Sequence, residues 1–474
     1  MPVTKATIAA PPATAESLAD AVQRIIGENV YLCYQCLKCT SGCPLAERFD
    51  LTPNQVMRSV QLGEARVLES RTIWLCASCE TCTTRCPQGI DIAGVMDALR
   101  IEARRRGIPP AIPEVDRFAR LFLTDVKLMG RLHEVGLMAG LNLLNRNLFK
   151  DMDMAVEMFK RGKLHLVALP TRPPSPDAVK PVTPAANKIA YYPGCSLHSS
   201  AGEYHHTIEA VAEKLDLELV EPPGWICCGS SAAHSTDRVL ATRYPVVNLS
   251  IIEQMGLEEV TTPCAACYSR FKTAAHEVAE NPEMARQVSA EIGYEYGGKV
   301  RIMHLVEALI EKVGLDRIEK EVKKPLKGLK VACYYGCYIT RPAEITGAEH
   351  PEYPMELDDL MRRLGAEPVA WDYKTDCCGG SLGLTQTPLA HEMTAKVLRN
   401  AKARGADAIV TVCPLCHVNL DGRQAQIKDL GFAMPVLYAT QLAALALGLE
   451  EKAALLEKNL VDPRPLLRDK GLID

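Results

Sequence analysis

The sequence GWICCGSS at 224–231 and the sequence KTDCCGGS at 374–381 each place two adjacent cysteines before a glycine. Neighbouring Cα atoms lie about 3.8 Å apart, which is below the usual separation of about 4.4–6.8 Å for a disulfide. A disulfide within either pair is therefore a poor explanation, and we expect these thiols to hold something else.

The sequences around the two cysteine pairs also repeat. KIAYYPGC at 188–195 matches KVACYYGC at 330–337, and VTTPCAAC at 260–267 matches VTVCPLC at 410–416. Two homologous halves are the simplest account of these matches. Each half supplies five cysteines in the same order, which are Cys195, Cys227, Cys228, Cys264 and Cys267 in the first half and Cys337, Cys377, Cys378, Cys413 and Cys416 in the second.

Each half alternates strand-like and helix-like patterns. A short β-rich run begins the half, and a second apolar run leads into the C-x2-C motif. Between them, HHTIEAVAEKL at 205–215 has apolar residues at helical spacing. This alternation predicts an open α/β sheet. The cysteines are then expected in loops at the carboxyl ends of strands, where such sheets bind ligands.

Composition narrows the class of protein. The chain has 19 cysteines, a net charge of −4 and a pI near 6.3, and it begins with no apolar segment of the kind found in signal peptides. Free thiols are typical of reducing compartments and suit metal ligation. No apolar run is long enough to span a bilayer, and no G-x-G-x-x-G or P-loop motif is present. We expect a cytoplasmic protein without a nucleic-acid partner and without flavin or nucleotide of its own.

Two further motifs lie near the N-terminus, CYQCLKCTSGCP at 33–44 and CASCETCTTRCP at 76–87. Both follow C-x2-C-x2-C-x3-C-P, the spacing that holds cubane [4Fe–4S] clusters, and in two-cluster ferredoxins the fourth cysteine serves the other cluster. Structural zinc is the alternative, but it has no use for four such cysteines in each of two motifs. The predicted ligands are Cys33, Cys36, Cys39 and Cys86 for one cubane and Cys76, Cys79, Cys82 and Cys43 for the other.

The rest of the N-terminal region has helical patterns. NQVMRSVQLGEARVLES at 54–70 separates the two motifs, which favours an α-helical ferredoxin over a β-hairpin type, and more helices are expected between 113 and 163. The proline-rich stretch 165–187 predicts an extended linker. We therefore predict an α+β multidomain protein with a ferredoxin domain at 1–164, the linker at 165–187, and two α/β halves at 188–320 and 321–474.

The motifs together resemble a known enzyme family. The N-terminal motifs, with GRLHEVGLMAGLNLLNRNLFK at 130–150, are similar to the C-type subunit of heterodisulfide reductase. The duplicated unit with YYPGC, YYGC and CCG resembles the B-type subunit of the same enzyme, which represents the CCG-domain family. The chain looks like a fusion of the two subunits over nearly its whole length.

This resemblance implies cofactors, a reaction and partners. Each half would hold one noncubane [4Fe–4S] cluster through its five cysteines, and a disulfide would be reductively cleaved between the two clusters, or a thiol oxidised in reverse. Electrons would come through the two cubanes from a flavin-containing protein like the family's A-type subunit. A hydrogenase, formate dehydrogenase or ferredoxin would be a further partner in a hetero-oligomer. The resemblance also implies anaerobic metabolism.

Two alternatives stay open. The chain also resembles iron–sulfur subunits of flavin-dependent glycerol-3-phosphate, glycolate or lactate dehydrogenases, which pass electrons toward quinone. A zinc-binding module without turnover is the second alternative, although five cysteines per half exceed what zinc needs.

Four more residues near the motifs have no assigned catalytic role. His198, His234 and His417 follow motif cysteines closely, and each suits either proton donation or a hydrogen bond that tunes a cluster. Cys333 aligns with Tyr191 and is expected to be a small buried strand residue.

Overall fold

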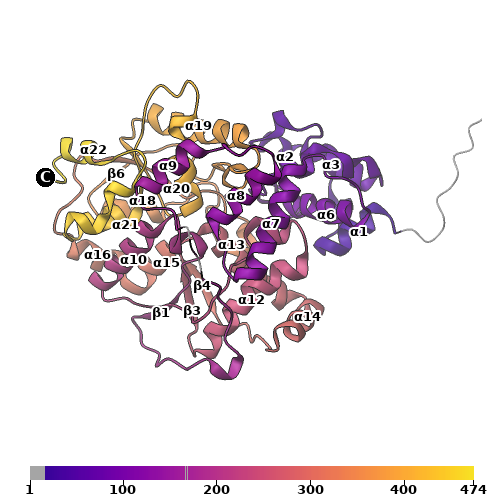
Figure 1. Cartoon of the computed structure of the whole chain (residues 1–474), viewed down its shortest axis with the longest axis horizontal. Coiled ribbons are helices and arrows are strands. Elements are labelled where there is room, and N and C mark those ends of the chain that lie inside the picture. Colours follow the sequence, from indigo (N-terminus) through magenta and orange to yellow (C-terminus); the bar gives the residue numbers. More distant parts are fainter. Residues whose placement is uncertain (1–15, 166, 168) are drawn as a thin grey trace, which may run out of the picture.

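The computed structural model describes residues 16–474 except 166 and 168 (Figure 1). The N-terminal residues 1–15, on which the prediction of no signal peptide depends, lie outside the described part. Within the described part, no helix combines the length and the apolar character that crossing a membrane requires.

The ferredoxin domain is helical, as the spacing of its motifs predicts. Its helices pack around one apolar core that includes Val56, Met57 and Trp74. Thr52 and Gln55 form a capping box that begins the helix between the two motifs. These helices are α1 (Leu18–Ile26), α2 (Lys38–Ser41), α3 (Pro53–Gln61), α4 (Arg71–Leu75), α5 (Thr81–Thr84) and α6 (Ile92–Arg105).

Three further helices, α7 (Pro113–Met129), α8 (Glu134–Leu144) and α9 (Met152–Lys160), run across the duplicated region (Figure 1). The buried side chains of α7 and α8 share an apolar cluster with Cys227 and Tyr244 of the first half. The three helices therefore cover the repeat instead of enlarging the ferredoxin core.

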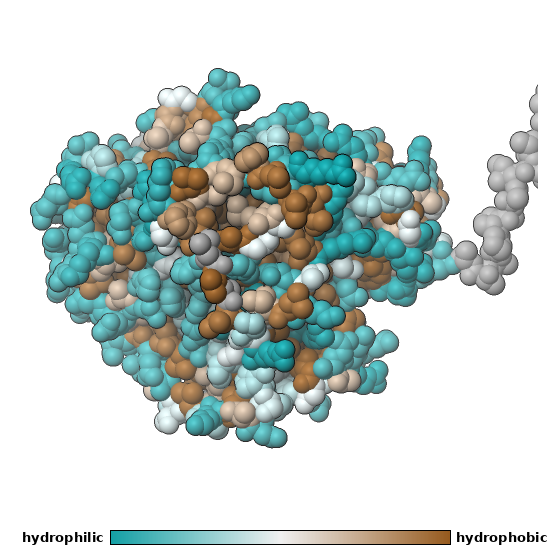
Figure 2. All heavy atoms as spheres, viewed as in Figure 1, coloured by the Kyte–Doolittle hydropathy of each residue, from teal (hydrophilic) through white to brown (hydrophobic). Residues whose placement is uncertain are grey.

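The outer side of this helical cover is apolar. Figure 2 shows hydrophobic side chains gathered over α8 and α9. We call this the apolar surface of residues 128–169; most of the exposed large apolar side chains belong to it, namely Leu128, Leu143, Leu144, Leu148, Phe149, Met152, Val156, Phe159, Val167 and Leu169.

The first half contains a four-stranded parallel sheet in the order β2-β1-β3-β4. The expected helix at 205–215 forms and buries Ile208, Val211 and Ala212. The strands are β1 (Lys188–Tyr191), β2 (Glu218–Val220), β3 (Glu259–Thr262) and β4 (Arg301–His304), and the helices are α10 (Gly202–Lys214), α11 (Ser230–His234), α12 (Arg238–Gln254), α13 (Ala265–Glu280), α14 (Pro282–Ile292), α15 (Leu305–Ala308) and α16 (Leu315–Glu321).

The second half repeats this topology in the order β6-β5-β7-β8, again all parallel. One apolar core joins the two halves, since Ile189 of β1 and Val331 of β5 belong to the same cluster. The strands are β5 (Lys330–Tyr334), β6 (Glu367–Pro368), β7 (Ala408–Thr411) and β8 (Val436–Tyr438), and the helices are α17 (Ala343–Thr346), α18 (Glu356–Arg363), α19 (Thr387–Ala403), α20 (Pro414–Leu420), α21 (Ala439–Ala446) and α22 (Arg464–Asp469).

The described part of the proline-rich stretch packs on the protein. Thr171 N donates a hydrogen bond of 2.9 Å to Met129 O, and Val182 N donates one of 2.8 Å to Met255 O. The stretch thus follows the surface of the first half.

Candidate functional site

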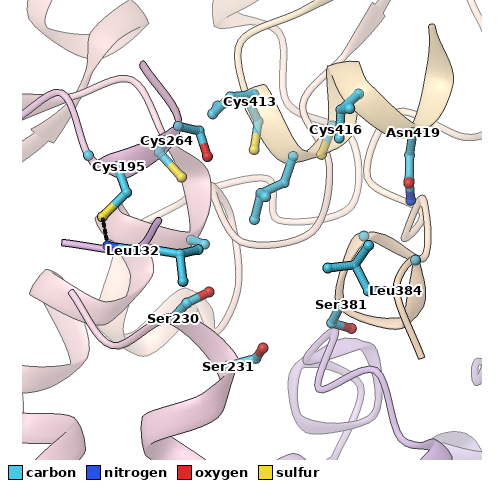
Figure 3. Close-up of a pocket in the computed structure, with 18 of the residues that line it drawn as sticks. Leu132, Cys195, Ser230, Ser231, Cys264, Ser381, Leu384, Cys413, Cys416 and Asn419 are labelled. Carbon is cyan, nitrogen blue, oxygen red and sulfur yellow. Dashed lines mark hydrogen bonds between the residues drawn. The ribbon is translucent and has the colours of Figure 1, made fainter. Parts of the chain in front are cut away.

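A cavity of about 230 Å³ is lined by both halves of the repeat. The cysteines that the repeat aligns all reach its walls, and Figure 3 labels four of them. The set is Cys195, Cys227, Cys228, Cys264, Cys267, Cys337, Cys377, Cys378, Cys413 and Cys416.

The sheets position these cysteines at the carboxyl ends of parallel strands, as the α/β prediction requires. Cys195 begins the short 3-10 helix that follows β1, and Cys264 occupies the N-cap position of α13 after β3. Cys337 follows β5 and Cys413 caps α20 after β7 in the same way. Corresponding strand ends therefore present corresponding thiols.

Glycine precedes the first cysteine of each half for a steric reason. Gly194 and Gly336 have φ of +77° and +72°, a left-handed backbone that favours glycine. A Cβ atom on Gly194 would lie 3.1 Å from Cys267 Sγ, and one on Gly336 would lie 3.1 Å from Cys416 Sγ. The bare backbone is what lets each loop pass close to the thiol of its C-x2-C motif.

The thiols of the first half contact one another without forming disulfides. Cys228 Sγ lies 3.2 Å from Cys267 Sγ. Hydrogen bonds with Cys195 and Cys228, together with burial, raise the pKa of Cys227 well above its ordinary value. Hydrogen bonds with Cys227 and Cys267 lower the pKa of Cys228 well below its ordinary value.

The second half has the same asymmetry. A hydrogen bond with Cys337 is the main cause that raises the pKa of Cys377. A hydrogen bond with Cys416 lowers the pKa of Cys378. In both halves, therefore, the pKa of the first cysteine is raised and that of the second is lowered.

This donor set fits iron–sulfur clusters. Buried thiolates at such density would repel one another unless a positively charged centre neutralised them, and iron–sulfur clusters are held by cysteine thiolates. A tetrahedral zinc ion needs only four ligands, so five cysteines per half leave one without a role. The residues present therefore suit a multi-iron cluster better than zinc.

The two N-terminal motifs fold alike. Each places a residue with left-handed backbone, Leu37 with φ of 67° and Glu80 with φ of 58°, directly before a four-residue helix, α2 or α5. The same local conformation thus follows from the same cysteine spacing.

The fourth cysteine of the first motif lies among thiols of the second. Burial, and next to it the thiols of Cys79 and Cys76, raise the pKa of Cys43. Burial and the thiols of Cys76, Cys79 and Cys43 likewise raise the pKa of Cys82. Tyr34 lies near both Cys36 and Cys86. In two-cluster ferredoxins the fourth cysteine of each motif binds the cluster of the other motif. The assignment of ligands to individual clusters stays a prediction.

The ferredoxin domain meets the second half directly. A hydrogen bond with Cys377, followed by burial, raises the pKa of Cys79 well above its ordinary value. Ser381 Oγ donates to Ala77 O over 3.2 Å. The buried Arg341 donates to Thr81 Oγ1 over 2.8 Å and to Thr375 Oγ1 over 2.9 Å, which ties the second N-terminal cysteine motif to the loop that leads into the second CCG motif.

Sequence reasoning missed the wall of the cavity that does not come from the repeat. Helices α7, α8 and α9 supply Phe118, Phe122, Leu137, Met154 and Met158 to the lining. Their helical pattern predicts an apolar face, but nothing in a single sequence says which surface that face covers. The cavity therefore has thiols on one side and an apolar wall on the other.

Of the three histidines near motif cysteines, His234 lines the cavity. Its Nδ1 lies 2.6 Å from Asp97 Oδ2. Its Nε2 is buried and has no hydrogen-bond partner among the described residues. Burial lowers the pKa of His234 in spite of this carboxylate. The contact with Asp97 orients the ring and leaves Nε2 as the nitrogen without a partner.

The other two histidines and Cys333 lie elsewhere. His417 is buried, with Nε2 3.0 Å from Val436 O, and stacks on Tyr438. His198 Nε2 lies 3.2 Å from Glu221. Cys333 is fully buried in β5, as the sequence predicts for it.

Comparisons with known proteins identify the parts. Residues 189–272 and 331–421 each match the cysteine-rich domain family named CCG, and residues 32–91 match the 4Fe-4S dicluster domain.

Several named relatives match over more than half of this chain. The 8-methylmenaquinol:fumarate reductase membrane anchor subunit of Wolinella succinogenes is 32% identical over 283 residues, which are 59% of this chain and 99% of the relative. The B-type subunit of the ferredoxin/F(420)H(2)-dependent CoB-CoM heterodisulfide reductase of Methanosarcina acetivorans is 29% identical, over 58% of this chain and 94% of the relative. A protein of Archaeoglobus profundus, named as similar to the B-type subunit of heterodisulfide reductase, is 31% identical, over 56% of this chain and 93% of the relative.

These matches confirm the duplicated cysteine-rich domain, the dicluster domain and the association with iron–sulfur electron transfer. The chain belongs to the CCG-domain family that includes the B-type subunits of heterodisulfide reductases, and it carries a 4Fe–4S dicluster domain in the same polypeptide.

Proposed function

We propose that this chain is the electron-transfer and catalytic iron–sulfur subunit of a heterodisulfide reductase-like complex. Electrons pass from a flavoprotein partner through two cubane clusters to two noncubane clusters, where a disulfide is cleaved to two thiols or the reverse occurs. The observation that carries the proposal is one cavity lined by the ten aligned cysteines, with Cys377 of that set in contact with Cys79 of the dicluster domain.

The clusters, when bound, supply the electrons one at a time. Cleavage of a disulfide consumes two electrons and two protons, so the protein has to deliver protons to the cavity. His234 is the residue placed to do so, because it lines the cavity, its Nε2 has no partner among the described residues, and Asp97 holds its Nδ1. In its protonated form the ring gives a proton from Nε2 to the departing sulfur, and in reverse the neutral ring accepts one.

The lining also predicts the kind of substrate. The wall of Phe118, Phe122 and Leu137 binds apolar groups and excludes water. Two buried guanidinium groups, those of Arg270 and Arg423, reach the same cavity. Arg423 is 3.2 Å from Asp151, whereas the hydrogen bond of Arg270 goes to the uncharged Ser269, over 3.0 Å. We infer a substrate with an apolar chain and an anionic group.

A second candidate is electron exchange with a membrane quinol, with the chain as the iron–sulfur subunit of a flavin dehydrogenase. The specific observation is the apolar surface of residues 128–169, whose helices also line the cavity on their inner side. The Wolinella succinogenes relative, named for an 8-methylmenaquinol:fumarate reductase, supports the same alternative.

Anaerobic purification followed by assays tests both proposals. The first predicts about sixteen irons and a similar amount of acid-labile sulfide per chain. It also predicts that dithionite-reduced protein reduces the CoB–CoM heterodisulfide or another disulfide that carries an apolar chain and an anionic group. Reaction with a short-chain naphthoquinone and with none of the disulfides would support the second. Stoichiometric zinc with little sulfide in the repeat would contradict both.

A further inference from the structure

Two histidines and a glutamate of the first half meet outside the cavity. His198, His205 and Glu221 each offer a ligand atom, and these atoms all lie within 4.8 Å of one another. None of the three lines the cavity, and none belongs to the cysteine motifs. The cluster is therefore separate from the iron–sulfur site.

The three residues come from different segments of the fold. His198 ends the short 3-10 helix Cys195–His198, His205 lies on α10, and Glu221 follows β2. His198 is exposed, and His205 and Glu221 are partly buried; the side chains have exposed fractions of 33%, 16% and 34%. The fold thus assembles the cluster from three separate segments of the chain.

Neighbouring groups hold two of the three side chains in place. Tyr191 OH lies 3.1 Å from His205 Nδ1. In the tautomer whose Nδ1–H donates to Tyr191 OH, Nε2 keeps a free lone pair. Trp225 Nε1 donates to Glu221 Oε1, and among the described residues Glu221 Oε2 accepts no hydrogen bond. Such outer partners are what metal-binding histidines and carboxylates commonly have.

We propose that His198, His205 and Glu221 bind one zinc ion, with water in the fourth position. Two imidazoles and one glutamate with an open position are an established zinc donor set. Neighbouring ligand atoms of tetrahedral zinc lie about 3.3 Å apart, so the side chains have to close by about 1.5 Å at most. Zinc is favoured over ferrous iron because it binds nitrogen and oxygen donors more tightly.

The charges around the cluster agree with one bound cation. Glu209 Oε1 lies 3.5 Å from His205 Nε2, one helical turn along α10, and is a second carboxylate within reach. Arg131 stacks on Trp225, with Nη2 4.0 Å from Glu221 Oε1. His198 Nε2 contacts the same Oε1 over 3.2 Å, so the carboxylate already faces one of the proposed ligands.

The second half shows what the same position looks like without ligands. The alignment of the two cysteine loops puts Thr340 where the first half has His198. The matching strand registers put Ala370 where the first half has Glu221. The zinc site therefore belongs to the first half alone, where it ties the Cys195–His198 turn to α10 and β2.

The experiment uses the full-length protein purified without oxygen, dialysed against micromolar zinc and then desalted. We expect about one zinc per chain, with a first shell of nitrogen and oxygen at about 2.0–2.1 Å in zinc-edge X-ray absorption. A first shell of sulfur at about 2.3 Å would mean that zinc occupies cysteine sites, and this result, like the absence of zinc, would overturn the proposal.

Variants test the ligands. His198→Ala combined with His205→Ala is expected to lower the zinc content at least about tenfold, while iron content and cluster spectra stay unchanged. His206→Ala is the matched control, because His206 adjoins His205 in sequence and its side chain is 67% exposed. Equal zinc in both variants would overturn the assignment. If the double variant misfolds, Glu221→Gln gives the same test, and the absorption shell of the unaltered protein stands independently.

Discussion

The two halves of the repeat share five cysteines and one sheet topology, but their cysteines face different neighbours. In the first half, Leu132 N, from the turn between α7 and α8, donates to Cys195 Sγ over 3.4 Å (Figure 3). The second half meets the dicluster domain through Cys377 and Arg341. We infer that the second half takes up electrons, while the first half and the helical cover bind the substrate.

The largest expected effect comes from breaking the entry of electrons into the second half. Cys79→Ala removes a predicted cubane ligand that also contacts Cys377. We expect a loss of about four irons per chain and a fall of disulfide reduction to background with an external electron donor. Iron analysis and steady-state kinetics measure both.

Cys333→Ala is the control for this change, because Cys333 is buried in a strand and is not a predicted ligand. It should keep the full iron content. Full iron in Cys79→Ala would show that the ligand assignment is wrong.

The next effect concerns a difference between the halves inside the cavity. In the alignment of the two CCG motifs, His234 of the first half corresponds to Leu384 of the second, and both residues line the cavity. His234→Gln removes the proposed proton donor and should slow disulfide reduction roughly 100-fold, with iron content unchanged.

The pH profile separates proton donation from a structural role. Burial lowers the pKa of His234, so the protonated ring that reduction needs is lost as the pH rises through a value below the ordinary 6.5 or so. Reduction should therefore slow with rising pH, and His234→Gln should lose this dependence. The exposed His276→Gln is the control, and an unchanged profile in His234→Gln would contradict proton donation.

A smaller effect tests whether the two CCG loops depend equally on their glycine. Gly229 and Gly379 have φ of +84° and +81°. A Cβ would meet Ala233 Cβ at 2.7 Å in the first half and Ala390 Cα at 2.9 Å in the second. Alanine at either position should lower stability by about 2–3 kcal/mol, since a strained backbone and a clash add.

Gly405→Ala isolates the backbone part of this cost. Gly405 has φ of +77°, with nothing within 4 Å of the position of a Cβ, so only about 1–2 kcal/mol is expected. Melting temperatures of the iron-loaded proteins give the comparison. Equal shifts in all three variants would mean that packing behind the CCG loops is unimportant.

The smallest effect is expected at the exposed edge of the contact between the dicluster domain and the second half. Arg48 pairs with Glu392 at 2.8 Å, and the two side chains are 55% and 45% exposed. Arg48→Ala should change stability by less than about 1 kcal/mol, because water and salt screen such pairs. Arg341→Ala, which removes the buried hydrogen bonds to Thr81 and Thr375, should cost more. If Arg48→Ala lost more stability than Arg341→Ala, the exposed ion pair would contribute more to the contact between the dicluster domain and the second half than the buried hydrogen bonds do.

Much of this architecture is predictable because cysteine spacing is a strong local signal. The repeat, the parallel α/β halves and the helical dicluster domain follow from motif spacing and periodicity, and the buried state of Cys333 follows from its alignment with Tyr191. These features depend on residues close in sequence or on the direct comparison of two halves of one chain.

The cavity wall and the proton donor are not predictable in the same way. Helices α7–α9 cover the repeat through contacts between residues that are distant in sequence. Amphipathic spacing predicts an apolar face on these helices but not the surface that this face contacts. His198, His234 and His417 all follow motif cysteines, and only the fold shows that His234 pairs with Asp97 and reaches the cavity. Its replacement by Leu384 in the second half is the one signal in the sequence that sets it apart.

The contact between the dicluster domain and Arg341 lies within a single polypeptide. The two domains therefore need a lower affinity for each other than two separate subunits would need. Association of covalently joined parts proceeds at a fixed effective concentration, on the order of millimolar for short flexible connections. A weak contact therefore keeps the domains together at any dilution. The rate of electron transfer per chain between the dicluster domain and the repeat is accordingly expected to be the same in nanomolar and micromolar solutions.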